Sequence, residues 1–174
     1  MRKLSIVVLL VLMLCGCQKT ENFETVTDQV INAEQGPKMQ IMVELPDEAA
    51  LEVMESSQDC SVYICDDYSL TVSTVEGGDL RKTVLEATGF YPEQLDGITT
   101  QHGEFTKYVC VWAAAGESGQ QIGRCAVIDD GSYHYVLTAL ADADKAGILT
   151  REGWQTVFRS FRLIKPEDVV SSGS

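Results

Sequence analysis

The sequence predicts an α+β domain in which an antiparallel β-sheet meander is covered by helices. Two observations predict this class. Three long strand-like segments follow one another with turn sequences between them, and an apolar stripe of helical spacing comes after them. Consecutive strands joined by tight turns pair antiparallel, and a helix with one apolar face buries that face against such a sheet. We therefore expect a single layered domain over residues 39–166.

The first half of this domain is expected to contribute short strands and two helices. Residues 39–45, 62–65 and 69–75 are rich in β-branched and aromatic side chains, which favour strands. A helix is expected to begin after Pro46, with Asp47 as its cap, and to run through Met54. A second helix is expected from Leu80, and Gly89 is typical of a helix end.

The second half is expected to form the meander itself. Its strands are residues 105–115, 120–129 and 132–140, with Glu117-Ser118 as the loop of the first turn. Asp129-Asp130-Gly131 is typical of the second turn. A last helix, with Thr150 as its cap, follows. Its apolar side chains recur at i, i+3, i+4 and i+7: Trp154, Val157, Phe158 and Phe161.

The N-terminus carries the most specific signal in the chain. Arg2 and Lys3 precede an apolar run of 11 residues, Leu4 to Leu14, interrupted only by Ser5. A membrane-spanning helix needs about 20 apolar residues, so this run has instead the length of a signal-peptide core. The following Leu14-Cys15-Gly16-Cys17 resembles a bacterial lipoprotein signal.

That resemblance implies how the chain is processed and where it is held. Residues 1–16 are removed by cleavage between Gly16 and Cys17, and Cys17 receives a diacylglycerol thioether with palmitate-type chains. Two acyl chains give stable anchoring. The implied location is the cell membrane, on its extracytoplasmic face, with the lipid as the membrane partner. An ordinary secretory signal with an incidental cysteine is the alternative.

Polar segments flank the expected domain. Residues 17–38 comprise the lipidated cysteine and an acidic stretch that ends at Gly36-Pro37, and we interpret them as a flexible tether. Residues 167–174 are interpreted as a disordered tail. The chain has 13 basic and 26 acidic side chains, a formal charge of −13. This charge argues against a nucleic-acid partner, since few cations are available to neutralise phosphates.

Four cysteines remain after processing, and an even number outside the cytoplasm predicts two disulfides. If Glu117-Ser118 is a two-residue loop, Cys110 lies directly opposite Cys125, at a distance that suits a disulfide. Cys60 would then pair with Cys65, which requires the chain to bend between them. Buried free thiols are the alternative.

No catalytic, metal or cofactor motif stands out in the sequence. His134 and His102 have no partner at metal-ligand spacing, and Gly116-Glu117-Ser118-Gly119 lacks the nucleophile pattern of a hydrolase. The aromatic residues Trp112, Tyr133 and Tyr135 could line a pocket, although such residues more often form one face of a sheet.

The last third of the domain resembles the end of PsbP-like domains. The resemblance is carried by the Asp129-Asp130-Gly131 turn, by Tyr133 to Leu137 and by the aromatic-spaced helix that closes with Ser160-Phe161-Arg162. It implies an α/β/α sandwich around an antiparallel sheet. Ala114 to Glu117 and Asp129 to Tyr135 also resemble a group of uncharacterised bacterial lipoproteins. Most members of this fold are non-catalytic binding or assembly factors.

Three functions are therefore weighed. The leading hypothesis is a non-enzymatic, lipid-anchored module that binds an envelope protein. The alternative is a lipoprotein that binds a small molecule or ion for transport or sensing. An unrecognised hydrolase is the least favoured.

Overall fold

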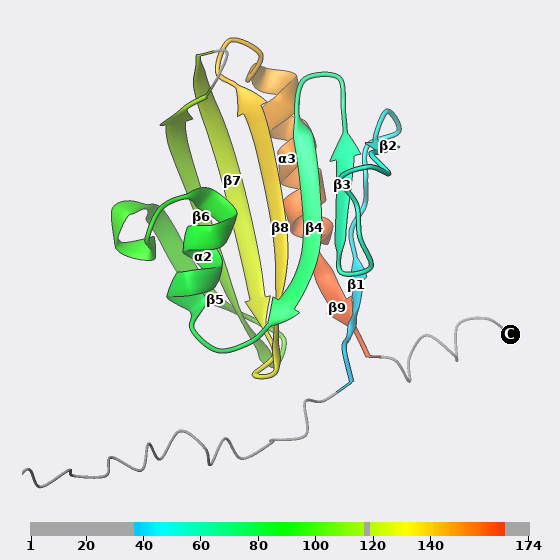
Figure 1. The fold of residues 1–174 in the computed structure, drawn as a ribbon, viewed down its shortest axis with the longest axis vertical. Coiled ribbons are helices and arrows are strands. Elements are labelled where there is room, and N and C mark those ends of the chain that lie inside the picture. The colour runs from blue at the N-terminus through cyan, green and yellow to red at the C-terminus, as the bar shows by residue number, and fades with distance from the viewer. Residues whose placement is uncertain (1–36, 117–118, 166–174) are drawn as a thin grey trace, which may run out of the picture. The chain divides into compact units, whose positions relative to one another are not determined.

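The main body is a seven-stranded sheet in which every neighbouring pair is antiparallel. The computed structural model describes residues 37–116 and 119–165, and of residues 148–150 only the backbone. Strands lie in the order β2-β3-β4-β8-β7-β6-β5 (Figure 1). Their bounds are Ala50–Leu51 (β2), Cys60–Ile64 (β3), Ser69–Glu76 (β4), Asp96–His102 (β5), Phe105–Ala115 (β6), Gln120–Asp129 (β7) and Tyr133–Asp142 (β8).

Two further strands form a separate ribbon. β1 (Gln40–Met42) pairs antiparallel with β9 (Arg162–Ile164), so the start and the end of the described chain lie side by side (Figure 1). The expected strand over residues 39–45 is thus present but shorter. Strand β9 was not expected.

The predicted meander is confirmed. β6 and β7 have the expected bounds, and β8 begins one residue later than expected and ends two later. The pairing of Ala115 with Gln120 places Cys110 directly opposite Cys125, as the two-residue loop predicts. The loop residues Glu117 and Ser118 themselves lie outside the described residues, as do the predicted signal, Cys17, the tether up to residue 36 and the tail 167–174.

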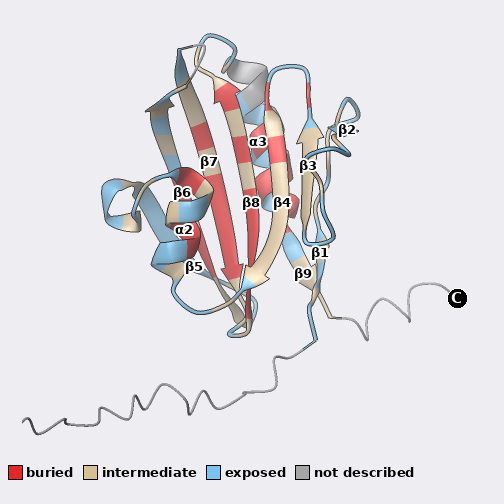
Figure 2. Cartoon of the chain, in the orientation of Figure 1, coloured by how far each residue is buried: buried red, intermediate tan, exposed pale blue. Residues whose placement is uncertain are grey.

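A helix covers part of each face of the sheet. In α3 (Ile148–Ser160) and just after it, the predicted stripe of Trp154, Val157, Phe158 and Phe161 is buried in the larger apolar core. On the opposite face, α2 (Leu80–Thr88) buries Val84 against a smaller cluster. The most deeply buried strands are β7 and β8, between the two layers (Figure 2).

The boundaries of α2 follow from its caps. The Asp79 side chain accepts a hydrogen bond from the Arg81 amide at 2.9 Å, and so satisfies a free donor of the first turn. Gly89 ends the helix with φ 79°, a left-handed conformation that glycine adopts without a steric penalty. A short 3-10 turn, η2 (Pro92–Gln94), then leads into β5.

The expected helix from Asp47 to Met54 is wrong. Asp47 lies in a turn, closed by a hydrogen bond from the Ala49 amide to the Pro46 carbonyl, and β2 follows. The Ser56 hydroxyl donates to the Glu52 carbonyl at 2.7 Å and accepts from the Val62 amide at 3.0 Å. Serine side chains that bond to the backbone in this way compete with helix formation, and here they stabilise a hairpin.

Two other expectations about elements also differ from the structure. Helix α3 begins at Ile148 with Gly147 at its cap position, so Thr150 does not cap it. Strand β5 was not expected, because Ile98 is the only large apolar residue in its sequence, DGITTQH. Its pairing with β6 stabilises an element that local patterning does not indicate.

Candidate functional site

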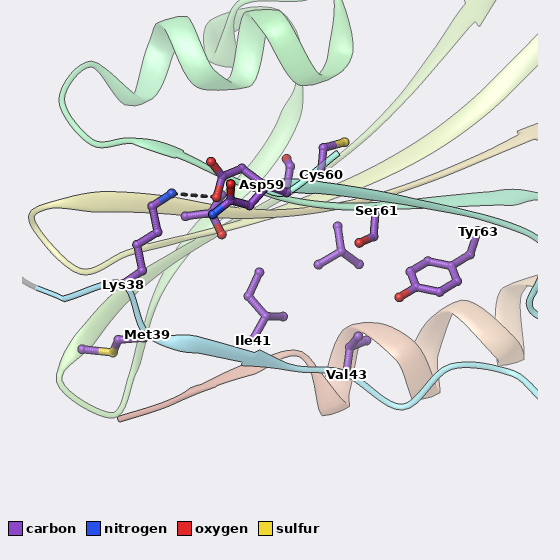
Figure 3. Close-up of a pocket in the computed structure, with 12 residues that line it drawn as sticks. Lys38, Met39, Ile41, Val43, Asp59, Cys60, Ser61 and Tyr63 are labelled. Atoms are coloured by element: carbon purple, nitrogen blue, oxygen red, sulfur yellow. Dashed lines mark hydrogen bonds and ion pairs between the residues drawn. The ribbon is translucent and has the colours of Figure 1, made fainter. Parts of the chain in front are cut away.

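A cavity of about 340 Å³ lies between residues 38–44, called the N-terminal segment below, and the β3–β4 hairpin. Ile41 and Val43 point from the N-terminal segment towards Ser61 and Tyr63 of β3 (Figure 3). Val72 of β4 adds a further apolar side chain to the lining. The lining thus combines these apolar side chains with four that carry hydroxyl groups, Ser61, Tyr63, Ser73 and Thr74.

The cavity exists because the N-terminal segment is held away from the hairpin by polar contacts to other elements. The Met39 amide donates to the Tyr135 hydroxyl at 2.8 Å, and that hydroxyl donates to Asp130 Oδ2 at 2.8 Å. Further along, the Glu44 amide donates to Ser160 Oγ at 2.8 Å. These anchors lie on β8, on the turn that precedes it and on α3, so they fix one wall of the cavity independently of the other.

An ion pair stands at the mouth of the cavity. Lys38 Nζ lies 2.6 Å from Asp59 Oδ1, and the two side chains are 44% and 50% exposed (Figure 3). The hydrogen bond to Asp59 raises the pKa of Lys38. Both charges face water, so their mutual attraction is weak and a charged group of a ligand could compete for either partner. The arrangement suits a small molecule with an apolar part and a polar end.

The predicted pocket of Trp112, Tyr133 and Tyr135 is not formed. Tyr133 and Tyr135 belong to the core on the α3 side of the sheet, with their rings edge-to-face at 6.3 Å. Trp112 packs with the cluster on the α2 side, and its indole lies against Gly123. The register of β6, β7 and β8 puts these side chains on opposite faces, because side chains alternate along each strand.

The four cysteines of the described residues are free thiols in the structure, so neither expected disulfide is present. The pairing of Cys60 with Cys65 is wrong, because β3 is extended between them and separates their Cα atoms by about 16 Å. Cys110 and Cys125 are directly opposed and buried, as expected. A hydrogen bond between these two thiols lowers the pKa of Cys110 and raises that of Cys125.

Sequence reasoning did not find Lys38, Asp59 or Tyr63 as site residues. A strand at residues 39–45 was visible, but no local pattern shows that it pairs with β9 and stands opposite β3. Within residues 37–116 and 119–165, no three His, Cys, Asp or Glu side chains come together as a metal site requires. Nor does any described helix have the length and apolar character to cross a membrane.

Comparison with known proteins shows the fold. No family model matches the chain, and no curated protein matches it. A protein from Bacteroides thetaiotaomicron is 10% identical with a TM-score of 0.51; the match covers 73% of this chain and 46% of that one, so this chain spans about half its length. Cyanobacterial PsbP (CyanoP) from Synechocystis sp. PCC 6803 is 14% identical with a TM-score of 0.50, and the match covers 72% and 92%.

A third solved structure is LpqN, described as involved in cell envelope biogenesis of Mycobacterium tuberculosis. It is 16% identical with a TM-score of 0.49, and the match covers 75% of this chain and 86% of that one. The likeness to CyanoP confirms the expected PsbP-like fold, an antiparallel sheet with helices on its faces. At such low identities the likeness concerns the fold alone.

Proposed function

We propose that this chain is a lipid-anchored protein on the extracytoplasmic face of a bacterial membrane, and that its PsbP-like body is a non-enzymatic module that binds another envelope protein. The anchor is supported by the sequence: a basic start, an apolar run too short to span a membrane, and Leu14-Cys15-Gly16-Cys17. Protein binding is supported by one observation on the body.

That observation is an apolar corner at the β2 edge of the sheet. Leu51, Val53 and Met54 are 50%, 72% and 91% exposed within four consecutive positions. Exposing large apolar side chains in one place costs free energy, and such surfaces are often covered by a partner. Glu52 and Glu55 alternate with them, so the corner has the polar rim that protein interfaces share.

The anchor is tested by replacing the lipidated cysteine. With Cys17→Ser, we expect the protein to leave the membrane fraction and to lose incorporation of an alkynyl palmitate label. Cys15→Ser is the matched control, because that residue is removed with the signal and its loss should change neither result. Label and membrane retention in the Cys17→Ser protein would overturn the proposed anchor.

Protein binding is tested by site-specific photocrosslinking in intact cells. A photoreactive residue at Met54 should give one reproducible adduct, and Val53→Ser should weaken it several-fold. The matched control places the same photoreactive residue at Tyr91, which is 46% exposed and lies outside the apolar corner. Absence of an adduct specific to position 54 would overturn the role of this corner.

The cavity between β1 and β3 favours a second candidate function, the binding of a small molecule with an apolar part. Val72→Phe should fill the space without adding charge, since Val72 lines the cavity. A small amphiphile that raises the melting temperature of the wild-type protein but not of Val72→Phe would support this function. No such molecule in a broad thermal-shift screen would count against it.

A further inference from the structure

The two edges of the seven-stranded sheet differ sharply. At one edge, β2 has only two residues. At the other, β5 has seven, and the first six of them are exposed (Figure 2). Among the described strands, none pairs with the outer side of β5. Half of the backbone N–H and C=O groups of β5 therefore face outwards along its whole length.

Strand β5 lacks the devices that usually protect an edge. Proteins shield open edges with lysine, proline, bulges or very short strands, because an unshielded edge accepts another strand. β5 contains neither lysine nor proline, it pairs with β6 without a bulge, and its five central residues, GITTQ, are uncharged. Its side chain Ile98 is 64% exposed, and Val111 of the neighbouring β6 is 48% exposed.

We propose that β5 pairs antiparallel with β5 of a second copy of this chain, so that two sheets join into one. The argument for this occupant is that the two ends of β5 are electrostatically complementary. Burial and the positive charges of Lys107 and Arg162 lower the pKa of His102, so its neutral imidazole can donate a hydrogen bond to a carboxylate in a positively charged surrounding. Only one antiparallel register pairs all seven residues with all seven of the copy, and it sets Thr99 opposite Thr99 of the second copy. The same register sets Asp96 opposite His102 of the second copy, at both ends of the joined strands.

The side chains match in this register as well. Asp96, Ile98, Thr100 and His102 lie on one face of the sheet because side chains alternate along a strand. Ile98 then faces Thr100 of the second copy, with the other Ile98 as its diagonal neighbour within reach. Together with Val111 of each copy, the isoleucines make an apolar strip across the join. A different partner strand would have to reproduce both the polar groups at the two ends and this strip.

This inference goes beyond the proposed function and does not depend on the lipid anchor or on the apolar corner. The corner lies at the β2 edge and the pairing surface at the β5 edge, and these are the two opposite edges of the sheet. The two sets of experiments therefore fail or succeed separately.

The register is tested by disulfide crosslinking of the full chain in intact cells with copper–phenanthroline as the oxidant. The background is Cys60→Ser, since Cys60 is the one cysteine of the described four that is not buried. Thr99→Cys should give a covalent dimer, because the two new thiols face each other. Gln101→Cys is the matched control, equally exposed on the same face but opposite Gly97 of the second copy, and should give at least five-fold less dimer. Equal yields from both positions, or none from Thr99→Cys, would overturn the proposal.

The pairing of positions 96 and 102 is tested in the Thr99→Cys chain by changing the charges at these two positions. His102→Asp places two carboxylates opposite each other and should lower the dimer yield several-fold, since like charges directly opposite destabilise a strand pair. Adding Asp96→Lys should restore the yield. Glu55→Lys, an exposed change of the same charge at the other edge, should not restore it. Restoration by both substitutions, or by neither, would overturn the predicted register.

Discussion

At the scale of single residues, a buried histidine joins a helix to the sheet. His134 is fully buried, and its Nδ1 lies 2.6 Å from Oγ1 of Thr83 on α2, which is also buried. The other ring nitrogen, Nε2, is 3.9 Å from Asp129 Oδ1 and has no partner at hydrogen-bond distance. The Thr83 contact is therefore the hydrogen bond that the imidazole makes in the folded chain.

We expect Thr83→Val to lower the free energy of unfolding by about 1–3 kcal/mol, because it leaves a buried histidine without a partner while preserving shape. Urea denaturation measures this difference. Thr71→Val is the control: Thr71 lies half-buried on the same face of the sheet and lines the same hollow beside α2. If both variants lost equal stability, the hydrogen bond to His134 would not be the cause.

Lys107 illustrates what the sequence does not reveal at this scale. The side chain is buried, and its ammonium donates to the carbonyls of Phe158 and Phe161 at 3.2 and 3.1 Å. A lysine in a strand is typical of the solvent-facing side. Its burial depends on the end of α3 lying over β6, where the negative end of the helix dipole favours a cation. Burial, and then the nearby Arg124, lower the pKa of Lys107.

At the scale of elements, a glycine in β7 determines how Trp112 packs on the face of the sheet that α2 covers. Gly123 is paired with Trp112 of β6, and a Cβ at position 123 would overlap the indole ring. The absence of a side chain at Gly123 lets the indole ring of Trp112 occupy this space. Glycine inside a strand often marks such a close approach.

We expect Gly123→Ala to cost about 1–3 kcal/mol of stability, because the indole must move from its place. Trp112→Leu loses packed surface of its own, but it leaves room for the methyl group, so the double variant should lose less stability than the two single variants added together. A thermal-unfolding double-mutant cycle measures the coupling. Simple additivity of the two substitutions would show that the contact does not govern packing here.

Elements with strong local signals were predictable, and those held by distant contacts were not. β6 and β7 were predicted to the residue, because long segments rich in β-formers end at glycine and aspartate turns. The fixed hairpin register also predicted that Cys110 faces Cys125. β5 and the cavity were not predictable. The wall of the cavity depends on contacts such as Met39 with Tyr135 and Glu44 with Ser160, about 100 positions apart in the chain.

At the scale of the whole molecule, buried tyrosines connect the separate parts of the core. Tyr68 packs edge-to-face on Trp154 of α3, with ring centroids 5.9 Å apart. Tyr108 lies on the α2 side, and Tyr135 holds the N-terminal segment through its hydroxyl. The pKa of each of these three tyrosines is raised, and burial is the largest cause in each case. The pKa of Tyr108 is raised to about 12, and the pKa values of Tyr68 and Tyr135 are raised more strongly.

These shifts predict that the fold loses stability in alkali. Above pH 10 the unfolded chain releases phenolic protons that the folded chain retains, so the free energy of unfolding falls as pH rises. Each tyrosine contributes up to about 1.4 kcal/mol per pH unit until its folded pKa is passed. Urea denaturation at about pH 9 and pH 11 measures the slope.

Tyr135→Phe should be less stable than the wild-type protein at both pH values, because the Met39 amide loses its acceptor. The free energy of unfolding of this variant should nevertheless fall less steeply with pH. If the Tyr135→Phe and wild-type slopes were equal, ionisation of this buried phenol would not drive the alkaline loss of stability.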